Sequence, residues 1–256
     1  MSDPTTRFSN RVEDYVRFRP RYPAQVIAAL EEICGLTADT EVADVGSGTG
    51  ILSEMFLRRG CRVFGVEPNR EMREAGERLL AHHGRFVSVD GRAEATGLPG
   101  ASVDLVTAGQ AFHWFDRPRT RDEFARILRP PAPVALAWNK RRKTGTAMAE
   151  AYEQVLLEYA VDYRSVDHDN VTDDVIAKFF RPGRVERRSL ENHRTLDHEG
   201  LEGYLRSASY APAPGHPSHA PMLAALRASF DRLNVGGTVV LEYDTLLYVG
   251  WLAPHA

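Results

Sequence analysis

The 256-residue chain has little of what several classes of protein require. Its only cysteines are Cys34 and Cys61, too few for a disulfide scaffold or a multi-cysteine zinc site. Apolar runs without a charge, such as residues 134–138, fall far short of the roughly 20 residues that cross a bilayer. The first ten residues also lack the apolar stretch of a secretory signal peptide. We therefore expect a cytoplasmic protein that does not span a membrane.

An excess of charge is missing too. A net charge of −3 and a pI near 6.3 give no sign of the basic surface typical of nucleic-acid-binding proteins, whose pI usually exceeds about 9. We expect no nucleic-acid partner. Hydrophobic residues make up 43% of the chain and charged residues 26%, which is typical of soluble globular proteins and sufficient for a large core.

Between residues 41 and 138, short β-like runs alternate with helical patterns. We expect strands at 41–45, 61–67, 85–90, 103–109 and 134–138, and helices at 51–60, 70–84 and 120–130. This alternation is typical of an α/β fold, a doubly wound sheet that is mostly parallel and has helices on both faces. We expect one domain over residues 1–256, with an N-terminal arm and helix at 1–36, a ligand-binding core at 37–139, and a helical cover with closing strands at 140–256.

The C-terminal part is richer in helical patterns. We expect helices at 147–163, 173–180, 200–209 and 221–233. A β-rich run at 238–250 follows the turn signal Gly236-Gly237, which predicts a closing hairpin or an edge strand.

A glycine-rich turn, DVGSGTG at residues 44–50, follows the first expected strand. Glycines at a switch from strand to helix let the backbone approach a ligand closely. The spacing is G-x-G-x-G, and Ile51 stands where the dinucleotide fingerprint has its last glycine. The turn therefore disfavours the alternative of an NAD(P)-dependent oxidoreductase.

Two acidic residues bracket this turn. Asp44 precedes it, where a carboxylate repels a pyrophosphate but suits a ligand with a positive ammonium or sulfonium group. Glu67 ends the next expected strand, where an acidic side chain accepts hydrogen bonds from both ribose hydroxyls of a nucleoside. Together they indicate a site for an adenosine with a cationic tail, such as S-adenosylmethionine (SAM).

Three segments in this order resemble the successive motifs of class I SAM-dependent methyltransferases: residues 42–50, 65–72 and 91–115. Three further segments resemble the type 11, trans-aconitate-methyltransferase-like group: residues 8–23, 200–210 and 239–250. The resemblance covers nearly the whole chain. It implies a seven-stranded, Rossmann-like sheet with a helical cover, SAM as the cofactor, and methyl transfer to a small-molecule acceptor.

The resemblance also implies a role for each matching residue. Asp44 would face the amino group of SAM, Glu67 would hold the ribose, and Pro68 would flank the nucleoside. The turn itself would enclose the methionine part, through Gly46, Ser47, Gly48 and Gly50.

The chain departs from the family pattern at two places. Relatives often have an aspartate where this chain has Arg92, so adenine recognition would rest on the backbone of Ala93 and Glu94, or on Asp90. Residues 129–133 read RPPAP where relatives have proline-glycine-glycine, which leaves the conformation of that turn open.

The sequence QAFHW at 110–114 follows an expected strand at the carboxyl edge of the sheet, where open α/β sheets bind ligands. We expect Gln110 beside the cofactor and take His113 as the best candidate for a catalytic base. A histidine satisfied by packing and one hydrogen bond is an equally good interpretation. Phe112 and Trp114 are expected in the core.

The N-terminal arm supplies two further catalytic candidates, Tyr15 and Arg19, with Tyr22 beside them. This segment has no obvious place in the sheet, so we expect a lid that excludes water. Arg19 would bind an acidic acceptor, because a guanidinium grips a carboxylate through two hydrogen bonds. A surface ion pair is an equally good interpretation of Arg19.

The acceptor chemistry stays open at this point. A carboxylate acceptor needs no base, whereas a hydroxyl or an amine would lose its proton to His113. A SAM-binding protein without turnover is a further alternative. We expect no metal, because the spacings of His193, His198, His216 and His219 match no familiar zinc motif and the sequence around them is loop-like.

Overall fold

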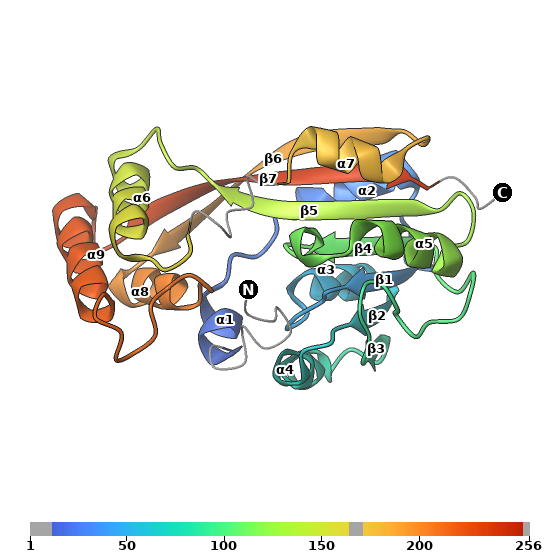
Figure 1. The fold of residues 1–256 in the computed structure, drawn as a ribbon, viewed down its shortest axis with the longest axis horizontal. Helices are drawn as coiled ribbons and strands as arrows, with labels where there is room; N and C mark the ends of the chain where they lie inside the picture. Colours follow the sequence, from blue (N-terminus) through green and yellow to red (C-terminus); the bar gives the residue numbers. More distant parts are fainter. Residues whose placement is uncertain (1–11, 164–170, 253–256) are drawn as a thin grey trace.

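A seven-stranded sheet runs through the computed structural model, which describes residues 12–163 and 171–252 (Figure 1). The strands are β1 (Glu41–Val45), β2 (Arg62–Val66), β3 (Phe86–Val89), β4 (Leu105–Gly109), β5 (Pro133–Arg141), β6 (Val185–Leu196) and β7 (Val239–Trp251). Their order in the sheet is β3-β2-β1-β4-β5-β7-β6. Strands β1 to β5 are parallel, and β7 is antiparallel to both of its neighbours.

Nine α-helices and one 3-10 turn accompany the sheet in the described ranges. They are α1 (Val12–Phe18), α2 (Gln25–Cys34), α3 (Ile51–Arg59), α4 (Arg70–Leu80), η1 (Phe112–Trp114), α5 (Arg117–Ile127), α6 (Ala147–Tyr159), α7 (Asp173–Phe180), α8 (His198–Arg206) and α9 (His219–Leu233). Several begin at a side-chain cap: the side chains of Asn69, Asp116 and Thr146 each accept a hydrogen bond from a backbone N–H in the first turn of α4, α5 and α6.

Successive residues of the central strands pack into two different hydrophobic cores, one on each face of the sheet. On β1, Val42 packs with α2 and α3, whereas its neighbour Ala43 packs with α5 and α7 on the opposite face. Strands buried on both faces read as nearly continuous apolar runs, as β1, β4 and β5 do. The predicted doubly wound α/β fold with a mostly parallel, seven-stranded sheet is therefore confirmed.

A third core lies at one end of the sheet, beyond the carboxyl ends of the parallel strands. Helices α6, α8 and α9 surround the first half of β7 there, and Phe18 at the end of α1 packs into the same cluster. Figure 1 shows these helices gathered at the left, with α1 beside α8. This helical cover encloses space in front of the strand ends, where ligands bind in open α/β sheets.

The prediction for residues 238–250 was wrong in one respect. Strand β7 is neither an edge strand nor part of a hairpin, because it lies between β5 and β6 and pairs with both. The edge strand on this side of the sheet is β6, which was not predicted because its sequence is rich in charged residues. Three of the four histidines placed in loop-like sequence also lie in regular structure: His193 on β6, His198 at the start of α8 and His219 at the start of α9.

The RPPAP turn leads into β5 through a residue with left-handed backbone. The peptide bond between Pro130 and Pro131 is cis, and Ala132 has φ +59°. Left-handed backbone at an alanine lowers the stability of the folded state by about 1 to 2 kcal/mol. Glycine adopts this backbone without strain, but it also gives the unfolded chain more conformational freedom, which offsets part of the gain. Replacing Ala132 by glycine should therefore raise the free energy of unfolding by about 0.5 kcal/mol.

Urea denaturation measures this change, and Ala125 of α5 offers a matched control. The same alanine-to-glycine change there should lower the free energy of unfolding by about 1 kcal/mol, because glycine is a poor helix former. Equal destabilisation by both substitutions would contradict the assigned strain at Ala132.

Candidate active site

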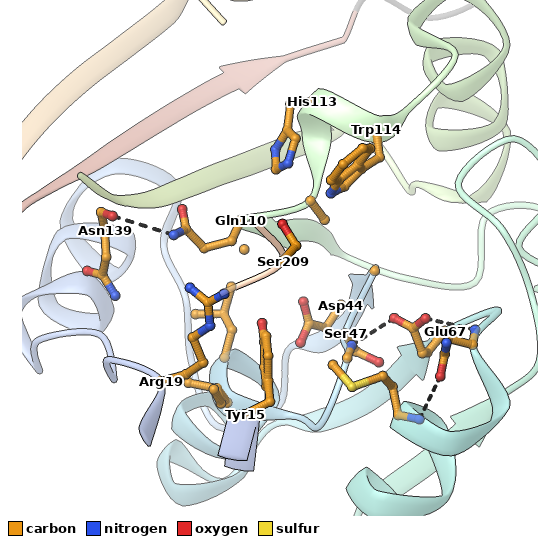
Figure 2. A pocket seen from close by; sticks show the side chains of 18 of the residues that line it. Tyr15, Arg19, Asp44, Ser47, Glu67, Gln110, His113, Trp114, Asn139 and Ser209 are labelled. Atoms are coloured by element: carbon orange, nitrogen blue, oxygen red, sulfur yellow. Dashed lines mark hydrogen bonds between the residues drawn. The ribbon is translucent and has the colours of Figure 1, made fainter. Parts of the chain in front are cut away.

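A cavity of about 280 Å³ lies in front of the carboxyl ends of β1, β2, β4 and β5. Its walls come from the glycine turn, the start of α4, the η1 turn, the N-terminal arm and the helical cover. Figure 2 shows Glu67 and Asp44 toward one end, with Arg19, Gln110 and Asn139 toward the other. Twelve of the thirteen predicted site residues line it: Tyr15, Arg19, Asp44, Gly46, Ser47, Gly48, Glu67, Pro68, Ala93, Glu94, Gln110 and His113.

Gly50 is the exception, since it is not among the lining residues. It has φ +85° and precedes α3, and a Cβ built there would lie 2.5 Å from the Leu80 side chain. Gly50 therefore serves the junction between the turn and the helix. Gly48 differs, because at φ +56° its Cβ would meet only Met72 Cε, at 3.3 Å, on the side of the cavity.

The glycine turn is fastened to the end of β2. The backbone N–H groups of Gly46 and Ser47 both donate to the carbonyl oxygen of Val66, at 2.9 and 3.2 Å. Gly46 has φ +70°, and a Cβ there would lie 2.6 Å from that of Ala111. Only glycine fits at this position, because the turn passes so close to the segment after β4. Gly46 also lines the cavity.

Asp44 is the buried, next-to-last residue of β1, and only one of its two carboxylate oxygens has a hydrogen-bond partner in the described structure. Its Oδ2 accepts a hydrogen bond from the Ser53 hydroxyl at 2.6 Å, whereas Oδ1 is buried without a hydrogen-bond partner in the described structure. Burial raises the pKa of the Asp44 carboxyl to about 7, against the lowering effect of Ser53. A buried carboxylate oxygen that lacks a donor suits a ligand ammonium group.

Glu67 holds the turn and its own strand end at the same time. Its two carboxylate oxygens accept hydrogen bonds from the backbone N–H of Gly48 at 2.9 Å and of Asn69 at 2.8 Å. Burial raises the pKa of this carboxyl, while the two N–H donors oppose that shift. Each oxygen keeps a second lone pair, so the carboxylate can also accept from two ribose hydroxyls.

The expected adenine region shows which of the alternatives lines the cavity. Ala93 is buried in the wall, and the Glu94 carboxylate accepts from the backbone N–H of Asp116 at 2.8 Å. Asp90 is not a lining residue, because its side chain is 72% exposed and pairs with Arg73. The structure therefore favours the segment of Ala93 and Glu94 over Asp90.

The segment after β4 divides between core and cavity. Phe112 is fully buried, as predicted, and packs edge-to-face on Phe179. Trp114, which was also predicted in the core, instead lines the cavity next to His113. Figure 2 shows the rings of His113 and Trp114 directed toward the cavity.

Gln110 has a left-handed backbone, with φ +55°, although it is not a glycine. Its Nε2 donates to the backbone carbonyl of Asn139 at 3.4 Å, and its Oε1 is buried without a partner in the part of the chain described. Strained backbone of this kind is typical of functional sites. Gln110 thus offers an unused acceptor in the cavity wall.

Arg19 reaches the cavity from the arm and has no counter-ion among the described residues. One guanidinium nitrogen donates to the carbonyl of Ser207 at 3.0 Å, and the group lies over the Tyr15 ring, 5.1 Å from its centroid. Its Nε is buried without a hydrogen-bond partner. Arg19 is therefore not a surface ion-pair residue, and a half-buried cation with a buried, unpartnered nitrogen suits an anionic ligand.

The lining residues of the helical cover and of the end of β5 were not predicted from the sequence. They include Asn139, Arg141, Tyr163, Tyr204, Ser209 and Tyr210. Arg141 is neutralised within the protein, since its guanidinium pairs with Glu153. Asn139 could have been predicted to line the site, because it directly follows an expected strand at the same edge of the sheet as Gln110.

The described residues form neither a membrane-spanning helix nor a metal-binding cluster. No helix in ranges 12–163 and 171–252 combines the length and apolar character needed to cross a membrane. The same ranges contain no cluster of three or more histidine, cysteine or acidic side chains arranged to hold a metal ion.

The strand order, the antiparallel β7 and the cavity at the first strand-to-helix turn are those of a class I SAM-dependent methyltransferase. A family model described as a methyltransferase domain matches residues 43–136. The chain is also 38% identical to an uncharacterized methyltransferase of Mycobacterium tuberculosis over 98% of both chains. The protein therefore belongs to the SAM-dependent methyltransferase family, and the oxidoreductase alternative is overturned.

Solved structures agree with this assignment. A candidate type II methyltransferase from Anaeromyxobacter dehalogenans is 25% identical, with a TM-score of 0.70 over 93% of this chain and all of its own. A methyltransferase assigned to an antibiotic biosynthesis pathway of Anabaena variabilis is 20% identical, with a TM-score of 0.64 over the same shares, and shows the same fold.

SAM binding should depend on pH through Asp44. We expect the ionised Asp44 carboxylate to pair with the ligand ammonium. Burial raises the pKa of this carboxyl to about 7, so protonation at lower pH should remove the form that binds. The affinity for S-adenosylhomocysteine should fall about tenfold between about pH 8 and about pH 6. Calorimetry measures this. A Ser53→Ala variant, which lacks the hydrogen bond that lowers the pKa, should shift the profile to higher pH, and a flat profile would contradict the assignment.

Proposed function

We propose that the protein transfers the methyl group of SAM to the carboxylate of a small organic acid, which Arg19 binds. The observation that carries the proposal is the half-buried Arg19 side chain, which lines the cavity with a buried, unpartnered Nε and without a carboxylate in ion-pair range in the described structure. Leaving such a cation unpaired is costly, and an acceptor carboxylate would satisfy it through two hydrogen bonds.

The charges along the cavity also support SAM at one end and an acid acceptor at the other. Asp44 and Glu67 stand at the end expected to hold SAM. Arg19 stands at the other end, and Lys140 and Lys143 also line the cavity. A cationic ligand and an anionic acceptor would therefore each meet opposite charge, which aligns them across the cavity.

The chemistry needs no catalytic base. SAM supplies a methyl group on a positively charged sulfur, which becomes a neutral thioether when the carbon–sulfur bond breaks. A carboxylate oxygen supplies the electron pair for the new oxygen–carbon bond, so a methyl ester forms and no proton is released. The chain contributes alignment and the exclusion of water: Arg19 orients the carboxylate, and Tyr15 closes the wall beside it.

The resemblance to the trans-aconitate-methyltransferase-like group supports a carboxylate acceptor as well. A second candidate acceptor is a hydroxyl or an amine, because His113 lines the same cavity and can accept a proton from either group. In that case Arg19 would bind a second group of the acceptor, and His113 would be essential.

Paired acceptors distinguish these possibilities. We suggest methyl-labelled SAM with a panel of organic acids that includes trans-aconitate, each acid beside its amide as a neutral control of the same shape. The proposal predicts turnover of at least one acid and none of its amide. Equal turnover of acid and amide would favour the second candidate. Binding of S-adenosylhomocysteine without turnover of any member would favour a SAM-binding protein.

A further inference from the structure

The backbone on both sides of Arg19 is held by side chains from β5 and β6. After Arg19, the carbonyl of Arg21 accepts hydrogen bonds from the Nδ2 groups of Asn192 on β6, at 2.9 Å, and of Asn139 on β5, at 3.3 Å. Before Arg19, the carbonyl of Phe18 accepts from the guanidinium of Arg194 on β6. The arm is thus tied down at both ends of the residue that enters the cavity.

The two amide side chains are themselves fixed. Oδ1 of Asn139 accepts from the Thr245 hydroxyl at 2.6 Å and from Nδ2 of Asn192 at 3.1 Å. Asn139 is only 5% exposed and Thr245 is fully buried, so both lie inside the protein. A buried network in which each member has its partners is rigid, and it fixes the carbonyl it holds.

Two glycines leave room for the aromatic residues of the arm. A Cβ at Gly203 of α8 would lie 2.3 Å from the Phe18 ring, and one at Gly109 of β4 would lie 2.6 Å from the Tyr22 hydroxyl. Described residues 12–22 of the arm are therefore packed in place rather than free, and residues 8–11 lie outside the described part. The expected lid is already closed over the cavity.

A half-buried cation without an ion-pair partner needs such support. Arg19 lies among tyrosines with no described carboxylate in ion-pair range, and solvent would attract its charge if the backbone could turn. Hydrogen bonds to the neighbouring carbonyls oppose that rotation. The network therefore does more than join the arm to the sheet, because it keeps the acceptor-binding guanidinium in the cavity.

We propose that Asn139, Asn192 and Thr245 are positioning residues that act through the arm to hold Arg19 in the acceptor site. The effect on the acceptor rests on the proposed function, whereas the effect on the arm does not. Asn192 is the residue to test, because Asn139 is too deeply buried for a simple substitution. His193, exposed and next to Asn192 on the same strand, is the matched control.

Kinetics with the best acid of the panel provide the first test. Asn192→Ala should raise the KM for the acid about tenfold and leave the affinity for S-adenosylhomocysteine within about twofold, while His193→Ala changes neither. In an Arg19→Ala background, Asn192→Ala should have less than about a twofold further effect on kcat/KM, because the residue through which it acts is gone. Additive effects would overturn the proposal.

Hydrogen exchange provides a second test that needs no acceptor. With S-adenosylhomocysteine bound, amides of residues 18–22 should exchange about tenfold faster in Asn192→Ala than in His193→Ala. If Asn192→Ala does not fold, Thr245→Val, which removes one hydroxyl at nearly constant volume, takes its place. If no acid is methylated, the proposed function fails and exchange alone decides: unchanged protection of these amides overturns the positioning role.

Discussion

Replacing Arg19 by alanine should lower kcat/KM for an acid acceptor about 100-fold, with unchanged affinity for S-adenosylhomocysteine. The lost interaction is a pair of charge-assisted hydrogen bonds in a buried site, worth about 3 kcal/mol together. Arg19 approaches the cavity from the arm, whereas the residues expected to hold SAM come from β1, β2 and the turns that follow them. The loss should therefore fall on the acceptor alone.

Two further variants sharpen this experiment. Arg19→Lys keeps the charge but not the planar pair of donors, so it should restore only part of the activity. Arg17→Ala is the matched control, because Arg17 belongs to the same arm but pairs with Glu199 at the surface, where both side chains are more than half exposed. It should behave like the unchanged protein. A similar loss with Arg17→Ala would show that any change in the arm impairs turnover.

Replacing Gly48 by valine should weaken SAM binding more than about 100-fold. The branched side chain would project into the cavity beside Glu67 and Met72, in space that the ligand needs. At φ +56° it should also lower the free energy of unfolding by about 1 to 2 kcal/mol, because L-residues rarely adopt this backbone. Calorimetry with S-adenosylhomocysteine and urea denaturation measure the two effects separately.

Gly35 supplies the control for backbone strain. It has φ +72° after α2, and a Cβ there would meet no atom within 4 Å. Gly35→Val should cost a similar free energy of unfolding and leave ligand binding intact. If both variants lost binding equally, general destabilisation rather than occupied space would explain the result.

The parallel half of the fold and the cofactor end of the cavity could be predicted because their signals are local. Buried strands such as β1 read as short apolar runs, and the residues expected to hold the cofactor follow directly on those strands and line the cavity. Gly50 shows the limit of the pattern: its spacing matches that of Gly46 and Gly48, but its backbone serves the start of α3.

The acceptor end could not be predicted in the same way. Strand β6 is an edge strand whose residues alternate between half-buried and exposed, so its many charges resemble a loop. Tyr163, Tyr204 and Tyr210 come from separate segments of the helical cover and meet only through its packing. Such contacts depend on the tertiary structure, and no spacing along the chain predicts them.

The position of the transferred methyl group tests the central claim most directly. We suggest supplying 13C-methyl SAM with an acceptor that carries both a carboxylate and a hydroxyl, and identifying the product by NMR. A cavity in which Arg19 holds the reacting carboxylate predicts a methyl ester, lost in Arg19→Ala and retained in His113→Ala. A methyl ether that is lost in His113→Ala would contradict the account.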